Sequence, residues 1–115
     1  MTNDQADTAF QALHDAQRAS QLLYMDLRDA GDDSGATSAK IRVDRLQKEI
    51  DNLINRQLVA WQAGAESLIP QLSGAANDAQ KAVDEVEQDV QNAKNIVSAM
   101  QALDKVIGVA MKFIG

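Results

Sequence analysis

The sequence predicts an all-α protein, an up-down-up antiparallel bundle of three helices with coiled-coil-like packing and a long C-terminal helix. Two observations support this fold class. The chain has 19 alanines, one proline and only 3% aromatic residues, a composition that favours helices over strands. Its apolar residues also recur at alternating spacings of three and four, which places them on one face of a helix. The 115 residues fit a single domain, 1–115.

The first helix is expected over about residues 4–30. Small and apolar residues form a heptad seam along it, consisting of Ala6, Ala9, Leu13, Ala16, Ser20, Leu23, Leu27 and Ala30. The following stretch, DAGDDSGATS at residues 29–38, holds two glycines and several helix-capping side chains. We expect this stretch to be the loop that reverses the chain.

The second helix is expected over about residues 37–69 and ends at Pro70, because proline cannot continue a helix interior. Its buried stripe is predicted to contain Val43, Leu46, Ile50, Ile54, Leu58, Trp61, Ala65 and Leu68. The basic cluster Lys40–Lys48 lies on this helix. We expect it to form a solvated face that pairs with the acidic residues of the first helix.

The third helix is expected over about residues 74–114, with Ser73 as a plausible N-cap. Its seam is predicted to contain Ala79, Val83, Val86, Val90, Ala93, Val97 and Met100, and then, after a shift of phase, Leu103, Ile107, Ala110 and Ile114. Short connections between the three helices favour antiparallel neighbours.

The C-terminal segment VIGVAMKFIG, residues 106–115, is the most informative part of the sequence. At 1.5 Å per residue the third helix would reach roughly 60 Å, against roughly 40 Å for the first, so the segment should project beyond its neighbours. Its apolar residues cover an arc of roughly 200°. Exposing them would forgo on the order of 10 kcal/mol of burial, so they need a cover. The open choices are the chain itself, a second copy, a partner protein and a membrane surface.

The predicted function is therefore that of a non-enzymatic module for protein–protein interaction or oligomerisation. The predicted interaction residues are Val106, Ile107, Val109, Ala110, Phe113 and Ile114. The expected partner is another protein or a second copy of the chain. The alternative is a membrane-surface-active or secreted helical protein, a component of a secretion or pore-forming system, in which the same residues enter the lipid interface.

Several other functions are disfavoured. The net charge of −6 disfavours nucleic-acid binding, and the lack of cysteine excludes thiolate chemistry. His14 is the single histidine and is expected on the surface, so we predict no catalytic residues, no metal site and no cofactor. No signal peptide or apolar run of membrane-spanning length is visible. The default location is the cytoplasm, and export without a signal peptide remains open.

Overall fold

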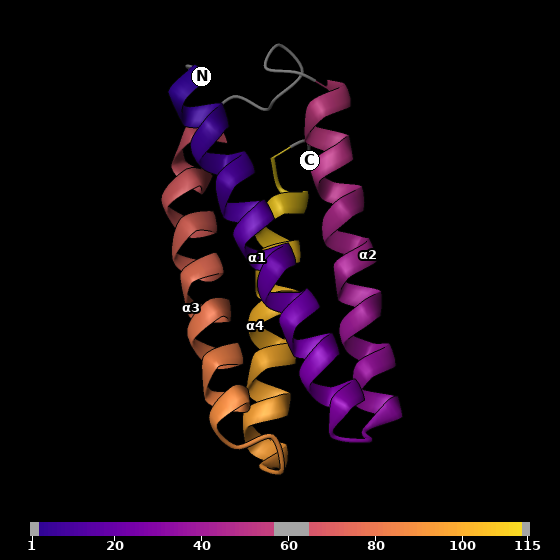
Figure 1. The fold of residues 1–115 in the computed structure, drawn as a ribbon. Coiled ribbons are helices and arrows are strands. Elements are labelled where there is room, and N and C mark those ends of the chain that lie inside the picture. The colour runs from indigo at the N-terminus through magenta and orange to yellow at the C-terminus, as the bar shows by residue number, and fades with distance from the viewer. Residues whose placement is uncertain (1–2, 57–64, 114–115) are drawn as a thin grey trace.

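The computed structural model describes residues 3–56 and 65–113, and within these ranges the chain forms four α-helices. They are α1 (Asn3–Asp29), α2 (Asp33–Arg56), α3 (Leu68–Gln88) and α4 (Ala93–Met111), with a short 3-10 helix, η2 (Ala65–Ser67), before α3. Consecutive α-helices run in opposite directions along a bundle about 45 Å long (Figure 1). The all-α class is confirmed, but the prediction of three helices is wrong.

The fourth helix arises because the predicted third helix is broken at residues 89–92. Asn92 adopts an extended backbone conformation, and its side-chain oxygen accepts a hydrogen bond from the backbone N–H of Lys94 at 3.0 Å. The N–H of Asp89 closes α3 by donating to the carbonyl oxygens of Glu85 and Val86. The side chain of Asn92 thus satisfies an otherwise unpaired N–H group at the start of α4. This turn contains neither glycine nor proline.

The turn between α1 and α2 is tighter than the predicted loop over residues 29–38. Gly31 has a φ of 83°, and the N–H of Asp32 donates to the carbonyl oxygen of Leu27 at 2.9 Å. This is the hydrogen-bonding pattern of a Schellman motif, which ends a helix at a glycine. The carboxylate of Asp32 then accepts from the N–H of Gly35 at 2.9 Å, so α2 begins at once.

The connection between α2 and α3 also differs from the prediction. Pro70 lies in the first turn of α3, where a missing N–H costs no intrahelical hydrogen bond. It therefore does not end the second helix, and Ser73 lies inside α3 instead of capping it. Leu58 and Trp61, both predicted in the core, lie outside the described residues.

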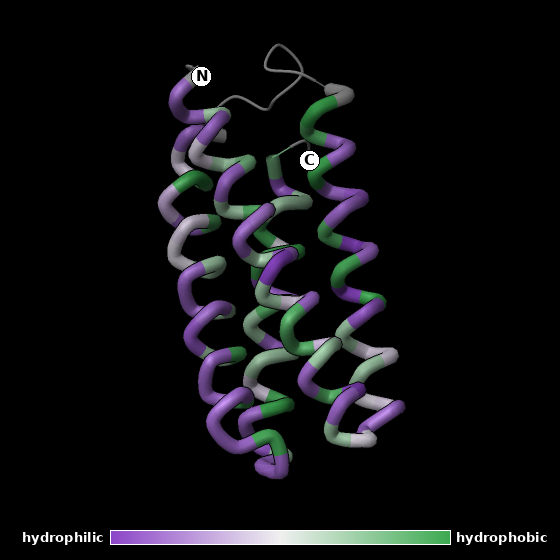
Figure 2. The backbone as a smooth tube through the Cα atoms, in the orientation of Figure 1, coloured by the Kyte–Doolittle hydropathy of each residue, from purple (hydrophilic) through white to green (hydrophobic). Residues whose placement is uncertain are grey.

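The core runs along the axis between the four helices. Seven of the eight predicted seam positions of α1 are buried, and only Ala30 is exposed. On α2 the buried stripe continues through Leu53, which is 1% exposed, and not through Ile54, which is 54% exposed. Figure 2 shows the resulting alternation of hydrophobic and hydrophilic residues along α2. The buried residues of α4 are Ala99, Leu103, Val106, Ile107, Val109 and Ala110, and Phe113 is buried just after the helix.

The second hairpin repeats features of the first. The sequence DAQRA at residues 15–19 of α1 has a counterpart, DAQKA, at residues 78–82 of α3. At this spacing of 63 residues the buried positions of α1 and α3 coincide, as in Ala6 and Ile69, Ala9 and Leu72, Ala12 and Ala75, Leu13 and Ala76, Ala16 and Ala79, Ser20 and Val83, and Leu23 and Val86. The first helices of the two hairpins, α1 and α3, thus share their pattern of buried positions.

Candidate interaction site

The C-terminal residues predicted to form an interface lie inside the bundle. Their exposed fractions are 0% for Val106, 2% for Ile107, 6% for Val109, 0% for Ala110 and 0% for Phe113. Ile114 lies outside the described residues. The turn at 89–92 folds α4 back among α1, α2 and α3, and together these three helices cover an arc that one neighbour could not. The expectation that this segment projects beyond the bundle is therefore wrong.

A second apolar row lies on the outer side of α4. Val97 and Met111, each 53% exposed, are separated by fourteen residues with Asp104 midway, so the three share one side of the helix. Met100 lies half-buried beside this row. Val97 was predicted to be a seam residue, but after the new turn the seam of α4 passes through other positions. The outer surface of α4 therefore exposes two large apolar side chains among its polar residues.

Asp104 in the middle of this row faces α2. Of the four pairs of neighbouring helices in the bundle, α2 and α4 pack least closely, and we call this the loosest side of the bundle. Arg42 of α2 spans it: its guanidinium lies 2.9 Å from Oδ2 of Asp104 and donates to the carbonyl oxygen of Met100 at 3.3 Å. Ile41, next to Arg42, is 53% exposed. We call the outer surface of these two helices the α2/α4 face, and define it by Ile41, Arg45, Lys48, Val97, Lys105 and Met111.

The four helices divide the charge of the protein unequally. The helix α1 carries five acidic and two basic residues, and α3 carries four acidic residues and one basic residue. These two helices pack against each other. The helix α2 carries four acidic and five basic residues, and α4 carries one acidic and two basic residues. Because helices with the same sign of net charge are neighbours, the bundle has an acidic side and a weakly basic side.

The basic cluster of α2 does not pair with α1 as predicted. Lys40 lies 3.4 Å from Asp44 of its own helix, and Arg42 pairs with Asp104 of α4. For Arg45, Lys48, Lys94, Lys105 and Lys112, all exposed on α2 or α4, the described part of the chain contains no ion pair. These cations are therefore available to an acidic partner.

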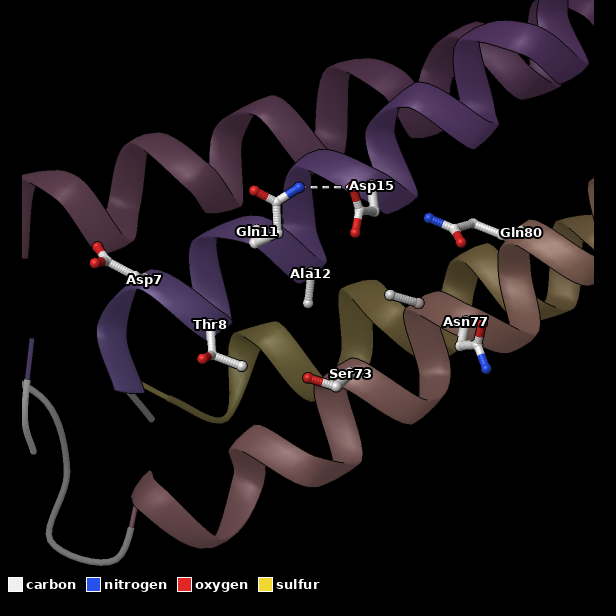
Figure 3. A pocket seen from close by; sticks show the side chains of 9 residues that line it. Asp7, Thr8, Gln11, Ala12, Asp15, Ser73, Asn77 and Gln80 are labelled. Carbon is white, nitrogen blue, oxygen red and sulfur yellow. Dashed lines mark hydrogen bonds between the residues drawn. The ribbon is translucent and has the colours of Figure 1, made fainter. Parts of the chain in front are cut away.

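The acidic side contains a groove between α1 and α3 with a volume of about 440 Å³. Its wall consists of Asp7, Thr8, Gln11, Ala12 and Asp15 from α1 and Ser73, Ala76, Asn77 and Gln80 from α3 (Figure 3). Small side chains such as Ala12 and Ala76 leave this space open. The amide of Gln11 donates to the carboxylate of Asp15 at 2.8 Å. None of the nine residues carries a positive charge, so the groove suits a basic ligand surface.

The same seam becomes more apolar and then more acidic towards the end of α3. Leu22, 41% exposed, lines a smaller hollow with Val83 and Asp84. One turn further along, burial and the nearby Asp29 raise the pKa of Asp26. Burial, Asp26 and Asp84 likewise raise the pKa of Glu87, whose carboxyl group lies within hydrogen-bonding reach of Asp26. Oδ2 of Asp26 is buried with no hydrogen-bond partner in the described residues, which disfavours the charged form of this carboxyl group. We call the outer surface along the seam between α1 and α3 the α1/α3 face, and define it by Asp7, Asp15, Leu22, Asp26, Asp84 and Glu87.

The described residues also bear on other kinds of site. No group of three or more His, Asp or Glu side chains in residues 3–56 and 65–113 is placed to hold a metal ion. Within the same ranges, no helix has the length and apolar character needed to cross a membrane. His14 is exposed on α1, as predicted. No protein-family model, curated protein sequence or solved structure matches this chain.

Proposed function

We propose that the protein is a non-enzymatic association module that binds a protein surface through its α2/α4 face. The observation that carries this proposal is the exposure of Ile41, Val97 and Met111, each more than half accessible, on the loosest side of the bundle. Apolar side chains gathered on one surface of a soluble bundle are typical of interaction sites. The role that the sequence predicts for the C-terminal helix is thus retained, but it moves to the opposite side of that helix.

The charge of the face selects the partner. Arg45, Lys48 and Lys105 are exposed on the same two helices as the apolar residues and have no ion pairs within the described chain. An apolar stripe flanked by acidic side chains on the partner would match both features. Opposite charges across an interface increase the association rate and exclude partners of the wrong sign. The expected partner surface is therefore apolar at its centre and acidic at its rim.

A membrane surface is the second candidate, because apolar residues next to lysines also favour anionic lipid. Lys94 and Lys105 of α4, and Lys112 just after its end, support it. Against it, Asp104 lies on α4 next to Lys105, Asp44 is exposed on α2, and the chain as a whole is acidic. Repulsion of these carboxylates by anionic headgroups favours the protein partner.

Site-specific photo-crosslinking in cells that naturally carry the gene tests the proposal. A photoreactive amino acid is placed at Val97 or Met111, and as a control at Asp78, which is exposed on α3. We expect both α4 positions to yield a defined protein adduct that the control does not yield. The captured protein is then purified, and its binding should be lost in the variant Val97→Asp/Met111→Asp.

The other outcomes contradict the proposal. Adducts to lipid in place of protein would favour the membrane surface. Adducts no more frequent than at Asp78, or binding unchanged in the double variant, would show that the α2/α4 face is not an interaction surface.

A further inference from the structure

We propose that the partner of the α2/α4 face is the α1/α3 face of a second copy of this chain. The bundles would then associate side by side, through two different faces. This inference rests on the proposed function, because it names the occupant of the same face. It uses a separate observation, the chemistry of the opposite side of the bundle. That side has the properties expected of the partner.

The first argument is charge. The α1/α3 face combines the helices in which acidic residues exceed basic residues by three each, whereas basic residues exceed acidic residues by one in both α2 and α4. Asp7 and Asp84 are exposed on the acidic side, and Arg45 and Lys105 are exposed on the basic side. At physiological ionic strength charges act over about 8 Å, so this local complementarity outweighs repulsion between the two net charges at contact.

The second argument is apolar surface. Leu22 of α1 is 41% exposed and lies on the α1/α3 seam, in a hollow that it shares with Asp15, Arg18 and Asp84. On the opposite side, Val97 lines a hollow with Lys94, and Met111 adjoins Lys112 in the chain. Each face therefore has an apolar centre and a charged rim, with rims of opposite sign. Such an arrangement buries apolar surface without leaving unpaired charge at the edge.

The third argument is size. The bundle measures 45 by 21 by 19 Å, so one side offers roughly 900 Å², close to the roughly 800 Å² per partner of a standard interface. The two faces differ, so contact between them leaves one free face on each outer copy. The expected assembly therefore grows with protein concentration and dissociates as salt is added.

Two variants with one blocked face each test the inference. Arg45→Glu/Lys105→Glu removes the basic rim, and Asp7→Lys/Asp84→Lys removes the acidic rim. Each variant alone should be a monomer by multi-angle light scattering, because one of its faces can no longer bind. Mixed together, they should associate again, because the intact acidic face of the first variant meets the intact basic face of the second. The wild-type chain should grow in mass with concentration in low salt and return to monomer at about 0.5 M salt.

The matched control is Lys40→Glu/Lys81→Glu, which has the same net charge as the first variant. Lys40 borders a hollow between α1 and α2, and Lys81 lies on α3, so both are outside the α2/α4 face. This control should associate like the wild type. Circular dichroism checks that every variant is folded, and the salt dependence of the wild type tests the inference without any substitution.

Several results would overturn the inference. A wild-type chain that stays monomeric at millimolar concentration in low salt would do so, as would blocked variants that do not associate when mixed. If that happens while Val97 still crosslinks to a different protein, the proposed function stands and the self-association fails. If Val97 yields no adduct above the control as well, both proposals fail.

Discussion

The guanidinium of Arg42 on α2 lies 2.9 Å from the carboxylate of Asp104 on α4, and the two residues join the loosest side of the bundle. The same guanidinium donates to the carbonyl oxygen of Met100 on α4 and to both oxygens of Ser38 one turn earlier on α2. The side chain of Arg42 is 18% exposed and that of Asp104 is 48% exposed. Arg42 therefore joins α2 to α4 through two contacts, one to the carboxylate of Asp104 and one to the backbone of Met100, and its bonds to Ser38 hold the guanidinium in place.

This geometry predicts unequal effects for the two partners. Arg42→Ala should lower the free energy of unfolding by about 2 kcal/mol, because it removes charge-assisted bonds to groups that are partly buried. Asp104→Asn should cost less than about 1 kcal/mol, as expected for an exposed ion pair. Arg42→Lys should behave more like alanine, because lysine lacks the planar fork. Urea titration measures all three variants, and equal losses for Arg42→Ala and Asp104→Asn would contradict the assignment.

Asp26→Asn should stabilise the protein at neutral pH, by on the order of 0.5 kcal/mol for a partly exposed pair. The raised pKa values of Asp26 and Glu87 mean that the folded state holds protons more tightly than the unfolded state. Their stabilising effect is therefore complete below the unfolded values near 4 and is lost as the pH rises through the folded values. Asparagine removes one charge and supplies an N–H donor, so the gain should shrink towards pH 4.

Thermal unfolding between pH 4 and pH 8 measures the effect of Asp26→Asn. The control is Asp78→Asn, which removes the same charge from an exposed position of α3. A gain at pH 7 that is equal for both variants would reflect only the net charge, and the two carboxyl groups would then not form a pair.

Phe113→Ala should lower the free energy of unfolding by about 3–5 kcal/mol, the usual cost of emptying a buried phenylalanine site. Met111→Ala, two residues away and 53% exposed, should cost less than about 0.5 kcal/mol. Phe113→Asp should unfold the chain outright. If Phe113→Asp instead keeps its helical circular dichroism and changes only the mass of the protein, the residue lies in an interface, as the sequence analysis predicted.

Two glycines should respond in opposite ways to alanine. Gly31→Ala should cost about 1 kcal/mol, because a φ of 83° is unfavourable for a residue with a Cβ atom. Gly74→Ala should raise the free energy of unfolding by about 0.5–1 kcal/mol, because Gly74 lies inside α3 with open space where a Cβ would be built. Midpoints of chemical unfolding measure both variants. A stabilising Gly31→Ala would mean that α1 does not end in a left-handed turn.

The sequence predicted the first hairpin better than the second. Gly31 next to Asp32 combines a helix-ending residue with a helix-starting one, and the structure uses both. In the second hairpin the corresponding signal is Asn92, a capping residue without a glycine before it. A long helix through Asn92 is locally reasonable because no residue there breaks it. The similarity of residues 15–19 and 78–82 is the signal in the sequence that indicates two equivalent hairpins.

Pro70 was misinterpreted for the opposite reason. Proline excludes a helix interior but suits the first turn, so its position alone cannot distinguish the end of one helix from the start of the next. In the structure Pro70 is the third residue of α3, whose N-cap residue is Ser67.

Periodicity along a helix is a property of the helix itself, so the buried seam of α1 and the helical class follow from the residues alone. Which outer side remains uncovered depends on how many helices surround it, and a single turn at residues 89–92 changed that number. Packing then placed Phe113 in the core, left Val97 outside, and brought the two acidic helices side by side. These features arise from contacts between residues far apart in the chain, which local sequence patterns do not encode.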